Sequence, residues 1–298
     1  MDGIISKDHF IQWADAGIFR LASISPGSSA KTINNPVIIL GCMRSGTSML
    51  AQLVASHTEV ATYRSKSRIA EANHLWHPKA HPWHKSNFSG PPHWFDPIEY
   101  TRTSVHAWTF DSERRIRTIF AFYQAFYKKL CFLNKSALIA CMIPQIMQVF
   151  PHARLIHIYR DGRAVALSNA KKQHPTVERN ADVFKRRGYY MSFEDILTKC
   201  AAGWCAQMLE IDRQVESEEL KEKDVLLELS YEELCANAGE WLNRIATFLN
   251  LSPDGFTVKD LSHIKSMNYK YKETLDGPTV EKITHIMEPA LRLKGYLV

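Results

Sequence analysis

An apolar run that leads directly into a glycine-bracketed turn constrains the fold of this chain more than any other feature. Val37–Leu40 is a run of branched aliphatic residues, typical of a strand that is buried on both faces of a parallel sheet. The turn Gly41–Ser48 follows at once, and apolar residues then recur at helical spacing over 49–54. A buried strand, a glycine turn and a helix in this order predict one unit of an α/β fold.

Two further stretches repeat this pattern later in the chain. Leu155–Tyr159 predicts a second buried strand, with a turn and the start of a helix over 160–170. Val225–Leu229 predicts a third strand and a helix near 238–249, and the apolar spacing over 193–216 predicts a long crossover helix. Strands that alternate with helices predict a central parallel β-sheet flanked by helices, with right-handed crossovers.

Length and composition indicate one domain with an unusual inserted region. The 298 residues, 45% of them hydrophobic, are enough for one large core, so we expect a single domain over 1–298 with 1–34 as an entry segment. Residues 72–112 carry four of the seven tryptophans, six of the thirteen histidines, five prolines and little periodicity. This stretch is interpreted as an aromatic-rich loop insertion, and long ordered loops in compact domains are often functional.

Charge, hydropathy and cysteine usage exclude several classes of protein. The formal net charge of +6 suits an anionic ligand but is no nucleic-acid signature, and clusters such as Lys171–Lys172 are interpreted as solvated surface. No apolar run approaches the roughly 18 residues of a membrane span, and residues 1–8 are too polar and acidic for a signal peptide. The six cysteines form no C-x-x-C pair and are interpreted as reduced, packed thiols. We therefore expect a cytoplasmic protein without a membrane or nucleic-acid partner.

The turn after the first strand has the G-x-x-x-x-G spacing of a P-loop, between Gly41 and Gly46. Between a strand and a helix, successive backbone N–H groups and the helix N-terminus form an anion site. The lysine that reaches the β- and γ-phosphates in nucleoside triphosphatases is absent, and Thr47 stands in its place. Arg44 supplies charge from within the turn instead. This set suits a single phosphate that bears a smaller anionic group, with no metal; the alternative is a glycine turn that only links a strand to a helix.

The turn also resembles a motif of the sulfotransferases that use 3′-phosphoadenosine-5′-phosphosulfate (PAPS). Its residues 44–48, R-S-G-T-S, are similar to the family's 5′-phosphosulfate loop, whose common form is R-S-G-T-[TS]. The resemblance implies a P-loop-type α/β fold and a set of residues that bind the 5′-phosphosulfate of the donor. These residues are Arg44, Ser45, Gly46, Thr47 and Ser48.

A second motif resembles the 3′-phosphate element of the same family. Tyr159–Ser168 begins at the end of a predicted strand, and the family uses its first arginine and the serine eight residues later. Here the resemblance implies Arg160 and Ser168. An arginine at a strand end and a serine about two helical turns further on can converge on one phosphate, the first as a forked donor and the second through its hydroxyl.

Weaker similarities extend the resemblance to most of residues 36–298. Ser230–Leu234 resembles the Y-E-[DE]-L segment whose tyrosine borders the nucleotide, which implies such a place for Tyr231. Asn134–Ser136 resembles an N-K-[SD]-P segment, although Ala137 replaces the proline. In the protein-tyrosine sulfotransferase branch that lysine lies beside the transferring sulfuryl group. The chain is most similar to bacterial members of this broad group.

The resemblance implies an enzyme that moves a sulfuryl group from PAPS to a hydroxyl or amine of a small-molecule acceptor, such as a secondary metabolite, and releases adenosine 3′,5′-bisphosphate. A carbohydrate or a peptide tyrosine remains open as acceptor, and so does the oligomeric state. Because the transition state of such a transfer is loose, positioning and charge stabilisation should dominate. Arg44 and Lys135 are the candidates for stabilising charge, and we expect the insertion over 72–112 to form the acceptor pocket.

Glu71 is the candidate base that accepts the proton of the acceptor. It follows the helix after the P-loop, where the protein-tyrosine sulfotransferase branch places its catalytic glutamate. The rival is a histidine of the insertion, such as His74, His77 or His106. His74, His77, His81 and His84 could also bind a metal if helical, but Pro78 and Pro82 interrupt any such helix, so we expect no metal site.

Two other function classes remain open from the residues themselves. A P-loop kinase or related enzyme with an altered loop would need a lysine and Mg²⁺ ligands from elsewhere in the chain. A non-catalytic nucleotide-binding module would bind the nucleotide and transfer nothing.

Overall fold

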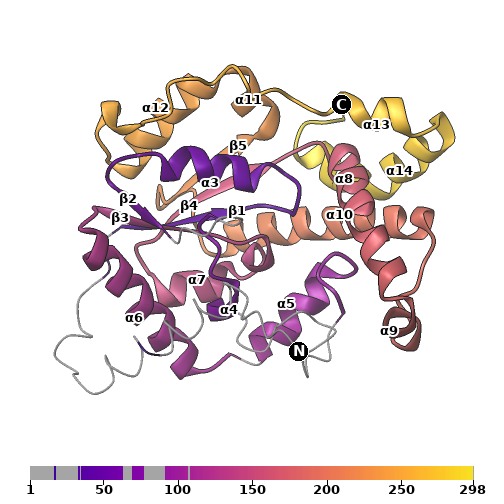
Figure 1. The fold of residues 1–298 in the computed structure, drawn as a ribbon, viewed down its shortest axis with the longest axis horizontal. Helices are drawn as coiled ribbons and strands as arrows, with labels where there is room; N and C mark the ends of the chain where they lie inside the picture. The colour runs from indigo at the N-terminus through magenta and orange to yellow at the C-terminus, as the bar shows by residue number, and fades with distance from the viewer. Residues whose placement is uncertain are drawn as a thin grey trace, which may run out of the picture.

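A parallel β-sheet forms the centre of the molecule (Figure 1). The computed structural model describes residues 35–62, 69–76, 91–106 and 108–297, together with Gly17 and Ile33. In this part of the chain, five strands pair in the order β2-β3-β1-β4-β5, and all of their pairings are parallel. The strands are β1 (Pro36–Leu40), β2 (Val60–Thr62), β3 (Cys131–Lys135), β4 (Arg154–Tyr159) and β5 (Leu226–Ser230).

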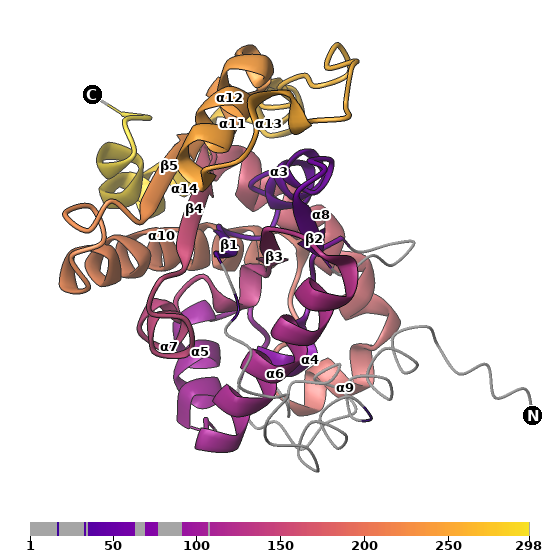
Figure 2. The ribbon, with the colours of Figure 1, turned by 90° about the vertical axis from the view of Figure 1, so that its left-hand side faces the viewer.

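Helices cover both faces of this sheet, as the two perpendicular views show (Figures 1 and 2). The first face packs against α3 (Thr47–Ala55), α11 (Tyr231–Ala236) and α12 (Ala238–Leu249). The second face packs against α4 (Asn73–Trp76), α6 (Phe110–Tyr127), α7 (Ile143–Val149), α8 (Gly162–Arg179), α10 (Phe193–Ser217) and α14 (Gly277–Leu293). The remaining described elements are α5 (Pro97–His106), α9 (Ala181–Arg186), α13 (Tyr269–Thr274) and the short 3₁₀ turns η1 (Ala137–Ile139) and η2 (Pro253–Gly255).

The central strand β1 explains why the apolar run Val37–Leu40 contains no polar residue. Val37 and Ile39 belong to the core on the α3 and α12 side, whereas Ile38 and Leu40 belong to the core on the α8 and α10 side. Successive side chains of a strand point to opposite faces, so a strand with a core on each side has no polar positions. The predicted α/β fold with a parallel sheet is confirmed, and the three predicted strands correspond to β1, β4 and β5.

The predicted insertion is more regular than expected. Part of 72–112 is helical, because α4, α5 and the start of α6 lie within it. The α6 start has a capping box, in which Thr109 and Ser112 satisfy each other's backbone N–H groups. Six polar residues dilute the apolar pattern of α5, which explains why its helical spacing was not visible in the sequence. Residues 77–90, which include three of the histidines considered for a metal, lie outside the described residues.

All six cysteines are free and all but Cys235 are buried, as the sequence predicted. In the part of the chain that the structure describes, no helix has both the length and the apolar character that a membrane span needs.

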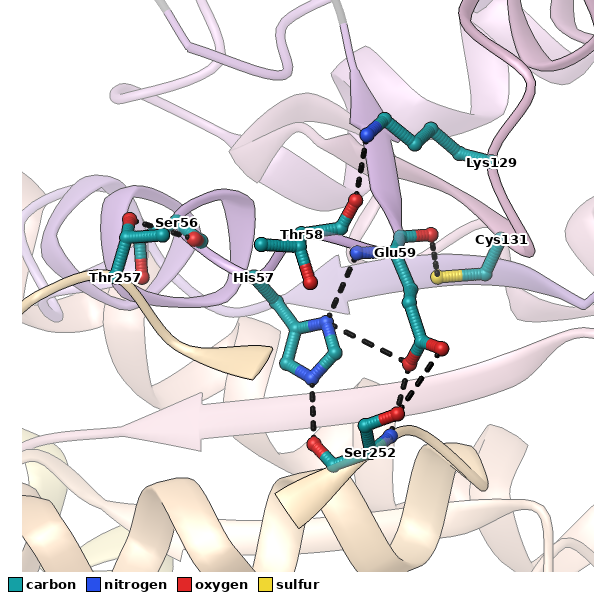
Figure 3. A network of polar contacts seen from close by, with 8 residues as sticks. All are labelled: Ser56, His57, Thr58, Glu59, Lys129, Cys131, Ser252 and Thr257. Carbon is teal, nitrogen blue, oxygen red and sulfur yellow. Dashed lines mark hydrogen bonds and ion pairs between the residues drawn. The ribbon is translucent and has the colours of Figure 1, made fainter. Parts of the chain in front are cut away.

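A polar network fixes the turn between α3 and β2 to the segment after α12 (Figure 3). The ring of His57 is buried; its Nδ1 accepts the backbone N–H of Glu59 at 3.1 Å, and its Nε2 donates to the carbonyl of Ser252 at 2.8 Å. The Glu59 carboxylate in turn accepts from the backbone N–H and the hydroxyl of Ser252 at 2.8 and 3.1 Å. Because this network directly precedes β2, it lies at the amino edge of the sheet. The opposite, carboxyl edge takes no part in it.

A second network ties the C-terminal helix to the other side of the sheet. His157 of β4 donates from Nδ1 to Oε1 of Glu228 on β5 at 2.9 Å. Lys294, at the end of α14, donates to the same oxygen and to Asp212 of α10, each at 3.1 Å. Burial alone would raise the pKa of Glu228, but the hydrogen bond from His157 and the charge of Lys294 lower this pKa to about 2.

This network predicts a pH-dependent contribution to stability. The folded-state pKa of Glu228 lies below its ordinary value, so its contribution is complete above about pH 5 and is lost as the pH falls towards 2. Glu228→Gln should therefore lower the free energy of unfolding by roughly 2–3 kcal/mol at pH 7. The deficit should shrink between about pH 5 and pH 2. Urea unfolding of both proteins at several pH values measures it, and a deficit that is constant with pH would contradict this account.

Candidate functional site

Four strand ends bring their following residues to one edge of the sheet. Because all strands are parallel, the turn 41–46 after β1, Lys135 at the end of β3, Arg160 after β4 and Tyr231 after β5 lie at the same carboxyl edge (Figure 1). In open α/β sheets this edge is where ligands bind.

The turn after β1 needs glycine at two positions. Gly41 has φ 150°, and a Cβ there would lie 2.4 Å from the carbonyl oxygen of Ile158; Gly46 has φ 93°, and its Cβ would lie 2.7 Å from the Tyr231 ring. Gly46 is the N-cap of α3, and no side chain caps this helix start, so its first N–H groups point into the turn. Ser45 is fully buried, and its hydroxyl has no partner among the described residues. Unpaired donors around a turn are the features of an anion site.

The two predicted anion motifs meet. Arg44 donates from Nε to the hydroxyl of Ser168 on α8 at 3.0 Å. Arg160 donates from Nη1 to the carbonyl of Arg44 at 3.1 Å, and its guanidinium lies 4.3 Å from the centre of the Tyr231 ring. Four residues that the sequence analysis took from separate motifs therefore belong to one cluster.

Two residues that the sequence analysis missed hold Arg160 in place. Asn268, just before α13, accepts from Nε of Arg160 at 2.8 Å and donates to the carboxylate of Glu232. Glu232 also accepts from the backbone N–H of Asp161 at 3.1 Å and from the hydroxyl of Tyr296 at 2.7 Å. Glu232 lies within the recognised Y-E-E-L segment and could have been singled out. Asn268 lies in a stretch without periodicity, and its contact spans 108 residues.

A pocket of about 510 Å³ opens at this cluster, with Arg44, Arg160 and Ser168 in its lining. Its volume is in the usual range of small-molecule sites. Lys171, Lys172 and Lys270 also line it. Lys171 and Lys172 are exposed, as the sequence analysis expected, but they face this pocket rather than open surface. Among the described residues that line it there is no carboxylate, so the pocket suits a polyanionic ligand.

Lys135 and Glu71 form an ion pair beside this turn. Their side chains are 4% and 20% exposed. Glu71 is held by its neighbour Ala70, which adopts φ 63° and whose carbonyl accepts from the backbone N–H of Lys135 and from Nδ2 of Asn134, each at 2.7 Å. Asn134 also accepts from the indole N–H of Trp76 at 2.9 Å. The residues on both sides of Glu71 are therefore anchored to β3.

The candidate histidines are not brought to this pair by the described structure. His106 lies exposed on the last turn of α5, and His77 and the side chain of His74 lie outside what the structure describes. His93, which the sequence analysis did not single out, is instead buried next to Cys42 and Met43 of the turn.

Comparison with known proteins decides the family. The sequence model of the sulfotransferase family matches residues 36–255. The chain belongs to the sulfotransferase family. No curated protein sequence matches it.

Solved sulfotransferase structures share the fold at low sequence identity. Sulfotransferase STF9 from Mycobacterium avium is 14% identical, with a TM-score of 0.59 over 93% of this chain and 81% of that one. STF1 from Mycobacterium tuberculosis H37Rv is 12% identical, with a TM-score of 0.55 over 95% and 85%. The sulfotransferase domain from the curacin biosynthetic pathway is 15% identical, with a TM-score of 0.51 over 90% and 99%. Like other family members, this sulfotransferase is an enzyme of sulfuryl transfer.

The anchoring of Glu71 can be tested through Asn134. Asn134→Ala leaves the buried indole N–H of Trp76 without its acceptor, which should lower the free energy of unfolding by about 1–3 kcal/mol. Because the variant also loosens the Ala70 carbonyl, turnover should fall as well. Urea unfolding and a sulfotransferase assay measure the two effects. Asn237→Ala is the control, since Asn237 is exposed and its side chain makes no cap hydrogen bond; equal results for both variants would contradict the anchoring role.

Proposed function

We propose that this sulfotransferase takes its sulfuryl group from PAPS and transfers it to a hydroxyl or amine of a small-molecule acceptor, with release of adenosine 3′,5′-bisphosphate. The observation that carries the proposal is the contact between Arg44 and Ser168, because it joins the turn after β1 to the helix after β4. The anion site at the turn with Arg44 and the anion site of Arg160 and Ser168 border one pocket. This arrangement suits a nucleotide with a phosphate at both ends.

Each end of the donor has its own set of groups in this proposal. The N–H groups and hydroxyls of 45–48 hold the 5′-phosphosulfate, and Arg44 adds a positive charge. Arg160 and Ser168 hold the 3′-phosphate, with Tyr231 as the flat surface against which the arginine is fixed. Thr47 stands where a triphosphate site needs lysine, which argues against the kinase alternative.

The Lys135–Glu71 pair supplies the chemistry of transfer. The acceptor oxygen or nitrogen attacks sulfur in line, a new bond to sulfur forms, and the bond between sulfur and the 5′-phosphate oxygen breaks. The leaving group keeps the electron pair of that bond, so charge builds up there and on the sulfuryl oxygens, where Lys135 and Arg44 stabilise it. Glu71 accepts the proton of the acceptor. Lys135 is its ion-pair partner before the donor binds.

The acceptor is proposed to be a compact organic molecule, such as a secondary metabolite. The aromatic-rich region supports this proposal, because it follows Glu71 directly and its Trp94 lines a void beside the phosphate turn. Aromatic side chains with a few polar groups are the usual lining of small-molecule pockets.

The donor assignment can be tested with Arg160→Ala. Loss of its charge-assisted hydrogen bonds, worth about 1.5–3 kcal/mol, should raise the dissociation constant of PAPS about 10- to 150-fold. Binding of adenosine 5′-phosphosulfate, which lacks the 3′-phosphate, should weaken much less, because for this nucleotide only the support of the turn through the Arg44 carbonyl is lost. Calorimetric titration without Mg²⁺ measures both, with the exposed Arg213→Ala as control. Equal losses for the two nucleotides would rule out the 3′-phosphate role.

The base can be tested with Glu71→Gln. Removal of a general base should lower kcat by about 10²- to 10⁴-fold, while the affinity for adenosine 3′,5′-bisphosphate stays nearly the same. The exposed Glu240→Gln serves as the control. Full activity of Glu71→Gln in a PAPS turnover assay would assign the proton transfer to another group.

A further inference from the structure

A small void lies beside the phosphate-binding turn and takes no part in the proposed donor site. Its volume is about 20 Å³, and Cys42 and Met43 of the turn form one side of it. Trp94 of the aromatic-rich region and Trp204 and Gln207 of α10 form the other sides. We call this void the Trp204 chamber. A void of this size holds a single water or one oxygen-sized group.

Two buried polar atoms at the Trp204 chamber lack partners. They are Nε1 of Trp204 and Nδ1 of His93, and neither has a hydrogen-bond partner among the described residues. The side chains are only 2% and 7% exposed, so bulk water does not reach them freely. Buried polar groups are nearly always paired in folded proteins, because an unpaired donor costs about 1–3 kcal/mol.

The surrounding hydrogen bonds show that both unpaired atoms are donors. The Cys42 thiol donates to Oε1 of Gln207 at 2.7 Å, which orients the amide so that its Nε2 faces the other way, towards the carbonyl of Ala137 at 3.4 Å and towards Nε2 of His93 at 3.5 Å. An amide N–H₂ group only donates, so Nε2 of His93 is the acceptor and its proton is on Nδ1. The indole N–H of Trp204 is always a donor.

The described residues that line the Trp204 chamber carry no charge. Burial lowers the pKa of His93 to about 4, so the ring is neutral at physiological pH. Burial raises the pKa of Cys42 well above its ordinary value and that of Cys200 to about 12, so both remain thiols. A carboxylate or ammonium group would therefore be buried here without an opposite charge, which is strongly unfavourable.

The Trp204 ring is held rigidly. It packs on Gly162 at the start of α8, where a Cβ would lie 2.5 Å from the ring. The same helix carries Ser168 of the proposed donor site, so the Trp204 chamber and the donor site share a wall. Neither Glu71 nor Lys135 lines the Trp204 chamber.

We propose that the Trp204 chamber binds one uncharged carbonyl or hydroxyl oxygen of the acceptor, distinct from the atom that attacks sulfur. This rests on the proposed function. Two N–H donors match the two lone pairs of such an oxygen. The acceptor class is thereby narrowed to molecules with a nucleophilic hydroxyl or amine and a second, neutral oxygen.

A pair of probes of nearly equal shape tests the proposal. meta-Hydroxyacetophenone carries a ketone oxygen where meta-ethylphenol has none, and meta-hydroxybenzoate carries a charge there. The ketone should bind at least about tenfold more tightly than the ethyl compound, since the ethyl compound leaves the two donors unpaired. The carboxylate should bind more weakly than the ketone. Calorimetric titrations with and without saturating adenosine 3′,5′-bisphosphate give the dissociation constants.

Trp204→Phe should abolish the preference for the ketone, whereas Trp241→Phe, a buried tryptophan of α12 on the other face of the sheet, should keep it. If Trp204→Phe does not fold, the indole N–H resonance of Trp204 in the wild-type protein decides: it should shift with the ketone and not with the ethyl compound. Equal affinities of the two probes, or no shift, would mean that water alone fills the Trp204 chamber and would overturn the proposal. If the protein binds the nucleotide but does not prefer the ketone, only the proposed role of the Trp204 chamber is overturned. If it prefers the ketone but does not bind the nucleotide, only the donor assignment is overturned.

Discussion

The guanidinium of Arg160 is the group on which the geometry of the site depends. It leaves β4, stacks on the ring that follows β5, and donates to the carbonyl of Arg44 after β1. Its Nε is held by Asn268, and among the described residues no hydrogen bond engages Nη2. One planar group therefore fixes the relative positions of three strand ends and the segment before α13. It also keeps donors in reserve for a ligand, and the planar guanidinium fixes their direction, whereas the donors of a lysine rotate freely.

This arrangement gathers positive charge around the pocket. Five basic side chains line the pocket, and the Glu232 carboxylate is linked to Arg160 by hydrogen bonds through Asn268. Like charges that lie close together cost free energy in the empty protein. A ligand with several negative charges removes this cost when it binds, so the same cluster that is unfavourable alone favours a doubly phosphorylated nucleotide over a neutral one.

The sequence allowed the strands and the phosphate turn to be predicted because their signals are local. The run before Gly41 and the run before Arg160 each report burial on both faces of the sheet within a few residues. β3 was not predicted, since it ends in the polar residues Asn134 and Lys135, which are buried only because the Ala70 carbonyl and Glu71 are there to pair with them. The same holds for contacts between distant segments in general. Such contacts leave no periodic pattern in the sequence.

The Lys135–Glu71 pair and the Trp204 chamber together suggest how the proposed reaction excludes water as an acceptor. Before the donor binds, Lys135 and Glu71 are engaged with each other in the ion pair. A donor with its sulfuryl oxygens near Lys135 competes for the same ammonium group, so the base becomes available only when there is a group to transfer. Release of Glu71 alone would still allow water to attack the sulfur atom of the donor. An acceptor fixed at a second point, by the two N–H donors of the Trp204 chamber, holds its nucleophile in line, whereas a water molecule has no such second contact and gains nothing from that positioning.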